Sequence, residues 1–167
     1  MRRTLLITST FVAALSYPAM AQPTAPVIVL KLSDARNALA GNHKPGIALK
    51  ELSAIDAKGT HVTLATVRRD AGEPTGLSHD HVTEIYQVLD GSAVLTTGGI
   101  FSGGGRAMTS KIDPGIGPSH EGIIQDGKQQ KVEAGDTVVI MSGTPHQFSN
   151  VDDHITYMVT RFGTEKY

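Results

Sequence analysis

Two histidines and one glutamate lie close together in the segment GLSHDHVTEIYQVLDG, residues 76–91. His79 and His81 are two residues apart, and on an extended backbone such residues point to the same side. Both imidazoles can therefore reach one centre. Glu84 follows three residues after His81, which on a regular strand is the opposite face. If all three converge, a turn or bulge between His81 and Glu84 must re-aim the carboxylate.

A further candidate ligand lies in a second segment, GDTVVIMSGTPHQFSN, residues 135–150. DTVVIM is typical of a strand, SGTP of a turn, and His146 then begins the next strand. In a closed barrel that strand can lie beside the first segment, so that three imidazoles and one carboxylate meet. Such a set suits a divalent transition metal: iron, manganese, nickel, copper or zinc. It fits calcium poorly, because imidazole prefers softer ions.

Tyr86 lies two residues after Glu84 and shares its face of the predicted strand. Glu84 could act as a catalytic base, and the Tyr86 hydroxyl could stabilise a developing oxyanion. The alternatives are a core tyrosine with a buried partner and a glutamate that holds a ligand imidazole by its other nitrogen. Arg68, Arg69 and Arg161 are candidates to bind a carboxylate substrate.

The composition restricts the classes of function. The chain of 167 residues has 15 Lys and Arg against 16 Asp and Glu, so it has no basic excess to neutralise nucleic-acid phosphates. Apolar types make up 40% of it, too much for a disordered chain. Because the sequence has no cysteine, thiolate metal sites, thiol nucleophiles and redox dithiols are excluded. Stability must then come from the core, aided by oligomerisation or a bound metal.

The N-terminus, MRRTLLITSTFVAALSYPAMAQ, is typical of a secretory signal peptide. Two arginines precede an apolar stretch, residues 5–15, which is too short to span a bilayer. Ala19 and Ala21 are the small residues expected before a cleavage site. We predict a signal peptide over residues 1–21 and a periplasmic or secreted mature chain that makes no membrane contact after cleavage.

Short runs of β-forming residues predict most of the elements that would position these side chains. They alternate with Gly, Pro, Asp and Asn at close spacing, which is typical of an all-β sandwich or barrel. Asp90-Gly91 and Asp126-Gly127 are interpreted as tight hairpin turns. The runs are IALKEL (47–52), HVTLATV (61–67), TEIYQVL (83–89), SAVLTT (92–97), GIIQD (122–126), KQQKV (128–132), DTVVIM (136–141) and ITYMVTRF (155–162).

The N-terminal arm and one long segment differ from this pattern. VIVLK, residues 27–31, is predicted to be an edge strand that could pair with a second chain in a homodimer. Ser33 is predicted to cap a short helix that ends before Gly41. The segment from Gly98 to Glu121 holds seven Gly and two Pro. It is interpreted either as a functional loop or as a surface insertion.

The two histidine segments together resemble the two motifs of the cupin superfamily. The first motif, G-x5-H-x-H-x3–4-E-x6-G, is matched by the four residues His79, His81, Glu84 and Gly91. Only two residues separate His81 from Glu84, which is shorter than the family spacing. The second motif, G-x5-P-x-G-x2-H-x3-N, is matched over residues 135–150, with methionine in place of the usual proline.

The resemblance covers about residues 45–165. It implies an all-β fold, the cupin double-stranded β-helix or jelly-roll barrel of two antiparallel sheets, over residues 45–167. An N-terminal arm with a short helix, residues 22–44, would precede the barrel. The resemblance also implies a divalent metal inside the barrel mouth, held by the residues that match the family ligands: His79, His81, Glu84 and His146.

The function implied by the resemblance is that of an exported metal-dependent enzyme acting on a small oxygenated organic molecule. Dioxygenase chemistry is the first expectation, and lyase or isomerase chemistry is the second. A non-catalytic barrel that binds a sugar or an organic acid is a further alternative, as is a structural oligomer, because the fold alone does not decide function.

Overall fold

The computed structural model of the chain describes residues 27–41, 44–57, 59–107 and 116–163. The predicted signal peptide lies outside these residues. The described part contains one short helix and ten strands: α1 (Leu32–Asn37), β1 (Ile47–Ala57), β2 (Thr60–Asp70), β3 (Gly76–His79), β4 (Val82–Thr97), β5 (Ile100–Ala107), β6 (Ser119–Gln125), β7 (Lys128–Glu133), β8 (Thr137–Ile140), β9 (His146–Ser149) and β10 (His154–Gly163).

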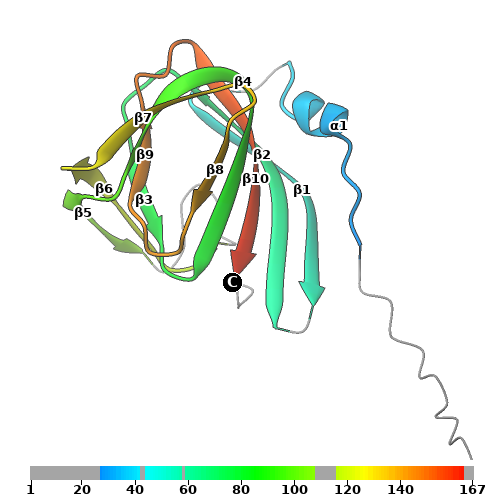
Figure 1. Cartoon of the computed structure of the whole chain (residues 1–167), viewed down its shortest axis with the longest axis horizontal. Coiled ribbons are helices and arrows are strands. Elements are labelled where there is room, and N and C mark those ends of the chain that lie inside the picture. The colour runs from blue at the N-terminus through cyan, green and yellow to red at the C-terminus, as the bar shows by residue number, and fades with distance from the viewer. Residues whose placement is uncertain (1–26, 42–43, 58, 108–115, 164–167) are drawn as a thin grey trace, which may run out of the picture.

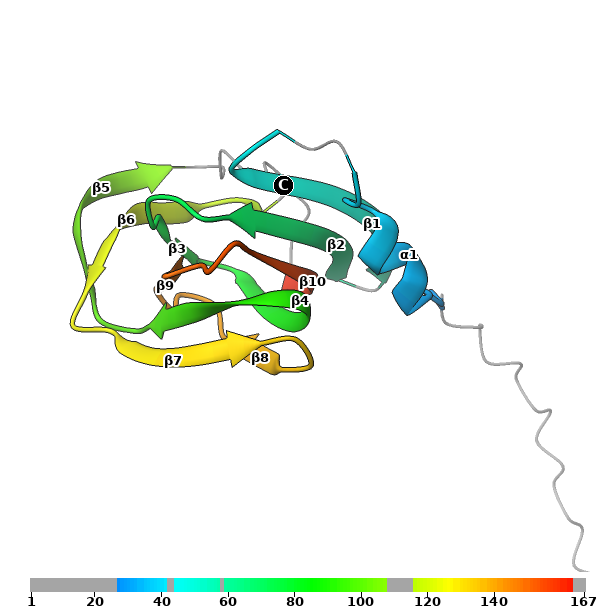
Figure 2. The same ribbon diagram turned by 90° about the horizontal axis from the view of Figure 1, so that it is seen from above.

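The ten strands are connected through β4, which belongs to two antiparallel sheets that enclose one interior (Figure 1). The first sheet has the order β1-β2-β10-β4-β8. The second has the order β7-β4-β9-β3-β6-β5. Seen from above, β1 and β2 lie on one side of the interior and β7 and β8 on the other (Figure 2). The predicted all-β jelly roll of two antiparallel sheets is confirmed.

Strand β4 belongs to both sheets because it turns a corner at Gly91. Its first half pairs with β10 and β8, and its second half pairs with β7 and β9. The register against β10 shifts between Thr156 and Tyr157, which marks a β-bulge, and Gly91 has a φ of +77°. The predicted hairpin turn at Asp90-Gly91 is therefore wrong. The register shift leaves Leu89 as the extra residue of the bulge, and the strand continues through Asp90 and Gly91.

The second predicted hairpin, at Asp126-Gly127, is also wrong. The chain does turn there, with Asp126 at a φ of +58°. However, β6 before the turn pairs with β3 and β5, whereas β7 after it pairs with β4. The turn therefore carries the chain from one part of the second sheet to another.

The Gly-rich segment from Gly98 to Glu121 contains more regular structure than its composition suggests. Residues 100–107 form β5, which pairs with β6. Residues 108–115 lie outside the described residues.

The predicted edge strand at residues 27–31 is wrong, because these residues form no strand and Val27 and Val29 are 80% and 86% exposed. The short helix is present, but Lys31 rather than Ser33 is its N-cap residue. The helix lies on the outer face of β2, where the Thr66 hydroxyl donates a hydrogen bond to its backbone at 2.9 Å. None of the described helices is long and apolar enough to cross a membrane.

Alternate residues of β2, β4 and β10 point into the barrel, as the two-residue period of a strand requires. They supply most of the buried core cluster. The inward residues of the three strands are Ala65 and Val67; Tyr86 and Val88; and Ile155, Tyr157 and Val159. The same alternation brings polar side chains into the interior, beside this core.

Candidate metal centre

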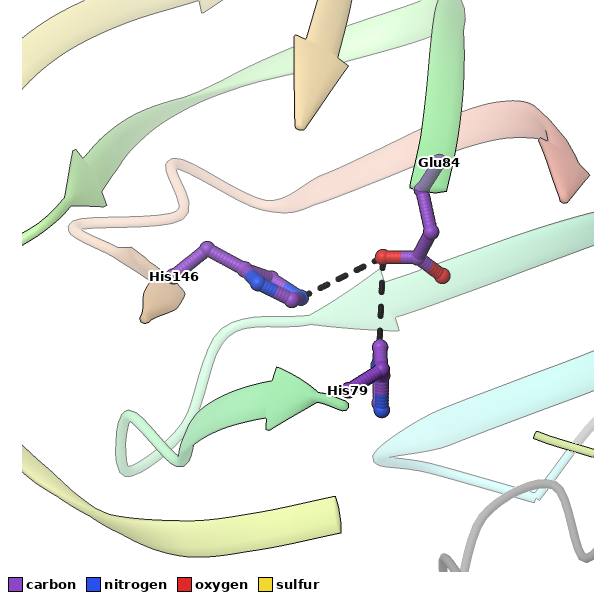
Figure 3. A group of neighbouring side chains, drawn as sticks. All are labelled: His79, Glu84 and His146. Atoms are coloured by element: carbon purple, nitrogen blue, oxygen red, sulfur yellow. Dashed lines mark ion pairs between the residues drawn. The ribbon is translucent and has the colours of Figure 1, made fainter. Parts of the chain in front are cut away.

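His79, Glu84 and His146 come together inside the barrel (Figure 3). His79 ends β3, Glu84 lies in the first half of β4, and His146 begins β9. The three side chains are only 3%, 1% and 4% exposed. Oε2 of Glu84 lies 3.3 Å from Nε2 of His146 and 3.8 Å from Nε2 of His79. Both histidine segments of the sequence thus contribute to one buried cluster.

His81 lies outside this cluster. Strand β3 ends at His79, and Asp80 and His81 form a bend before β4 begins at Val82. His79 and His81 therefore do not share an extended backbone, as the sequence interpretation assumed, and the His81 side chain is exposed. The break in the strand comes before His81 rather than between His81 and Glu84. A ligand role for His81 stays a prediction.

The proton of the His146 ring is placed on Nδ1 by the protein. The Nδ1–H group donates a hydrogen bond to the backbone carbonyl of Thr144 at 3.0 Å. Burial lowers the pKa of His146, so the ring is neutral and carries one proton. The lone pair of Nε2 is therefore directed into the cluster. This buried atom makes no hydrogen bond within the described residues, although Glu84 lies beside it.

His79 is oriented in the same way by Ser119, its direct neighbour across β3 and β6. The Ser119 hydroxyl donates its single proton to the carbonyl of Gly117 at 3.0 Å. It must then accept the hydrogen bond that joins it to Nδ1 of His79 at 2.8 Å. With Nδ1 as the donor to Ser119, Nε2 is the ring nitrogen of His79 that faces Glu84.

Glu84 is a buried carboxylate with two hydrogen-bond donors, one of them charged. Nε of Arg161 donates to Oε1 at 2.9 Å, and the Tyr86 hydroxyl donates to Oε2 at 2.6 Å. Burial opposes ionisation, but the pKa of Glu84 is lowered to about 2, with the Arg161 guanidinium as the largest opposing cause and the Tyr86 hydrogen bond adding to it. Burial and the adjacent carboxylate raise the pKa of Tyr86, so Tyr86 stays protonated and acts as the donor.

This arrangement fits a divalent metal ion. Two imidazole lone pairs and a carboxylate oxygen that face one another repel unless a cation lies between them. Metal bonds of about 2.0–2.2 Å to such atoms place neighbouring ligands roughly 3–3.5 Å apart, close to the 3.3 and 3.8 Å separations found here. Two imidazoles and one carboxylate suit the predicted metals: iron, manganese, nickel, copper and zinc.

Two residues of the cluster, His79 and Glu84, line a cavity of about 10 Å³ inside the barrel. Its polar lining includes His79, Glu84 and Tyr86 together with two arginines, Arg69 and Arg161. The remaining lining is largely apolar: Leu49, Val67, Leu77, Ile116 and Tyr157.

Sequence reasoning missed the contacts that orient the ligands. Ser119 gave no signal, because its role depends on the pairing of β3 with β6. Arg161 carried one available signal, since it lies two and four residues after Val159 and Tyr157 and so shares the inward face of β10.

The sequence matches no protein-family model, and no curated protein is significantly similar to it. Three solved structures resemble its fold. Dimethylsulfoniopropionate (DMSP) lyase DddQ from Ruegeria pomeroyi is 18% identical at a TM-score of 0.46, over 71% of this chain and 47% of that one. A recombinant oxalate oxidase in complex with glycolate is 24% identical at a TM-score of 0.46, over 77% of this chain and 57% of that one. The cupin domain of Schizosaccharomyces pombe Cnp3 is 9% identical at a TM-score of 0.48, over 74% of this chain and 69% of that one.

This chain spans about half the length of DddQ and less than two thirds of the oxalate oxidase. Because all three TM-scores lie below 0.5, these likenesses carry no conclusion about activity. The fold is established by the chain itself: two antiparallel sheets joined by β4, with both motifs directed into the interior. The chain has an all-β jelly-roll fold, as expected from its two motifs, which resemble those of the cupin superfamily.

Proposed function

We propose that this chain is an exported metal-dependent enzyme that carries out dioxygenase-type chemistry on a small oxygenated organic molecule. The observation that carries the proposal is the convergence of Nε2 of His79 and Nε2 of His146 on the Glu84 carboxylate. Two histidines and one carboxylate, with positions left open, are the donor set of non-haem iron(II) oxygenases. Iron bound there would supply Lewis acidity and the activation of dioxygen.

The residues around the ligands have defined tasks in this proposal. Ser119 and Thr144 fix the two imidazole rings, so that both Nε2 atoms are available without a proton. Arg161 keeps Glu84 ionised and holds Oε1, which leaves Oε2 directed at the histidines. The apolar walls of the pocket exclude water from the reacting group and strengthen every polar contact inside it.

A specific contact favours a second candidate, a metal-dependent lyase or isomerase. The Tyr86 hydroxyl and the Glu84 carboxylate form a buried hydrogen bond of 2.6 Å. A carboxylate beside a protonated tyrosine can accept a proton from an acidified carbon of the substrate, and the tyrosine can supply one to a developing oxyanion. This chemistry needs no dioxygen.

One set of measurements separates these candidates. Protein loaded with iron(II) without oxygen is mixed with small hydroxy acids, oxo acids and enols, and product and oxygen uptake are followed in air and under argon. The proposal expects that oxygen is consumed in air and that, when the oxygen supplied is isotopically labelled, the label appears in the product. Turnover under argon would instead establish the lyase or isomerase. Binding without turnover in either atmosphere would establish a non-catalytic binding barrel.

Export is proposed from the N-terminal sequence alone. The basic start, apolar stretch and small residues before position 22 favour removal of residues 1–21. N-terminal sequencing of protein recovered from the periplasm or medium of an expressing bacterium tests this. Cleavage after Ala21 is expected, and uncleaved protein retained in the cytoplasm would contradict it.

A further inference from the structure

We propose that the uncovered part of the outer face of the first sheet binds a second copy of this chain, so that two barrels pack sheet against sheet. The two chains would be related by a two-fold axis, and the same residues would lie on both sides of the interface. This inference goes beyond the proposed function and does not depend on a bound metal.

The outer face of the first sheet is apolar, although its inner face already forms the core. Leu64 precedes the core residue Ala65 and Ile85 precedes the core residue Tyr86, so the two-residue period of a strand directs both outward. A sheet with one solvated face normally places polar residues there. Instead, this face carries a group that we call the apolar outer patch: Val62, Leu64, Ile85, Val139, Met141 and Phe162.

The strand register joins most of these residues into two continuous rows. The first row crosses from β8 to β2 and consists of Val139, Ile85, Thr160 and Leu64. The second lies two residues further along the strands and consists of Thr83, Phe162 and Val62. Because directly paired residues of an antiparallel sheet point to the same side, the rows form one surface. Neither row contains a charged side chain.

The apolar outer patch is the part of this face that α1 leaves open. The helix lies on the side of the sheet away from the barrel interior, where it buries Thr66 and accepts its hydrogen bond at Ala35 (Figure 2). Charged outward residues, Lys50 and Arg68, lie at this covered end. Three residues of the patch remain exposed: Val139 at 59%, Met141 at 61% and Phe162 at 39%.

The absence of charge in the two rows favours a second copy as the partner. Across a two-fold axis, each side chain near the axis faces the same side chain of the partner or a close neighbour of it. A charged residue there would meet its own charge in a poorly hydrated interface, which is unfavourable. Rows of aliphatic, phenylalanine and threonine side chains avoid this repulsion. They also offer no countercharge to a charged partner of another kind.

The shape and the area of the face agree with this partner. Two sheets of the same twist pack face to face about 10 Å apart, with their strands about 30° from parallel. Five strands about 4.8 Å apart are roughly 24 Å wide, and an uncovered length of about six residues is roughly 20 Å. Two such faces bury about 1,000 Å² in total, the lower limit of a specific interface, so we expect a reversible dimer of micromolar affinity. This face, rather than residues 27–31, would hold the homodimer expected from the sequence.

Sedimentation velocity tests the dimer on the chain as recovered from an expressing bacterium, over about 1 to 300 µM. Wild type is expected to change from monomer to dimer within this range. Val139→Lys should weaken the dimer at least about 10-fold, because it buries a charge in an apolar interface. Ile123→Lys is the matched control: Ile123 is 50% exposed but lies on β6 in the second sheet. It should change the dimer affinity by no more than about twofold.

Cross-linking tests which surface the two copies share. The chain has no cysteine, so a single introduced cysteine reports its own position. Thr160 lies on β10, the middle strand of the five, and is therefore expected near the two-fold axis. Thr160→Cys should give a cross-linked dimer with a short bismaleimide, and Ser102→Cys on β5 should not. The reverse result would place the interface elsewhere and overturn the proposal.

The remaining outcomes also decide the matter. Wild type that stays monomeric over the whole range, or equal weakening by Val139→Lys and Ile123→Lys, would overturn the proposal. Monomeric wild type that sediments with phosphatidylcholine vesicles would show that a lipid surface covers the patch instead. If circular dichroism shows that Val139→Lys does not fold, Phe162→Lys replaces it with the same expected loss. Wild type that dimerises but takes up no metal would overturn the proposed function and leave this interface standing.

Discussion

Arg161 and Glu84 lie directly opposite each other on β10 and β4, and Nε of Arg161 donates to Oε1 of Glu84 at 2.9 Å. Both residues are buried, at 8% and 1% exposure. This ion pair keeps the carboxylate charged beside the two imidazoles. It also determines which carboxylate oxygen faces the candidate metal centre.

Removing the arginine should destabilise the metal-free protein and change its response to acid. In wild type the pKa of Glu84 falls from 4.5 to about 2, so its contribution to stability is present above about pH 4.5 and is lost as the pH falls toward 2. Arg161→Gln removes the main positive charge that offsets the effect of burial, so the pKa of Glu84 rises. We expect a loss of about 3–5 kcal/mol in the free energy of unfolding near neutral pH. Urea denaturation between pH 3 and 7 measures both effects.

Arg106→Gln serves as the control for this experiment. Arg106 pairs with Asp80, but its side chain is 59% exposed, so its loss should cost no more than about 1 kcal/mol. Equal stability of Arg161→Gln and wild type at pH 7 would contradict the account of the buried pair.

Ser119→Ala tests the orientation of the His79 ring. The hydroxyl accepts the Nδ1 proton of His79, so its removal frees the ring to change tautomer or rotate. Loss of such a partner typically lowers metal affinity about 10- to 100-fold. Competition titration against a chelator measures this. Ser92→Ala, which removes only an exposed contact to Asp152, should leave the affinity unchanged; an equal effect of both substitutions would refute a specific role of Ser119.

His81→Ala decides between three and four protein ligands. His79 is buried in the cluster, whereas His81 is exposed on the bend that follows it. We therefore expect His79→Ala to abolish stoichiometric metal binding and His81→Ala to retain it. Elemental analysis of both variants after identical metal loading gives the answer. Complete loss of metal from His81→Ala would show that the bend rearranges to supply a fourth ligand.

Gly91→Ala tests the corner of β4. A Cβ at this position would lie 1.9 Å from the backbone oxygen of His154, and the residue also has a positive φ. Gly98 has a similar φ, +71°, but a Cβ there meets nothing within 4 Å. Gly98→Ala should therefore cost only the left-handed backbone strain, about 1–2 kcal/mol. Gly91→Ala should cost several kcal/mol or prevent folding. Thermal denaturation compares the two, and similar melting temperatures would contradict the close packing at the corner.

Much of the barrel was predictable because its strands follow local rules. The alternating run at residues 155–162 corresponds to β10, and the runs on either side of Asp90-Gly91 both lie in β4. The connection at Gly91 was misread because a hairpin turn and a corner within one continuous strand can both place a glycine at positive φ. Only the partner strands distinguish them, and these are set by the whole fold.

The site was predictable to the extent that residue type alone defines it. His79, Glu84 and His146 were candidates because their side chains suit a metal, and the structure brings them together. The position of His81 depended on where β3 ends, which local spacing does not determine. The tautomers of the two rings depend on Ser119 and on the Thr144 carbonyl, which only the folded chain places beside them.

Anomalous diffraction from crystals of the metal-loaded protein tests the central claim most directly. The account predicts one ion per chain within bonding distance of three atoms: Nε2 of His79, Nε2 of His146 and Oε2 of Glu84. An ion bound elsewhere, with the imidazoles of His79 and His146 turned away from each other, would contradict it.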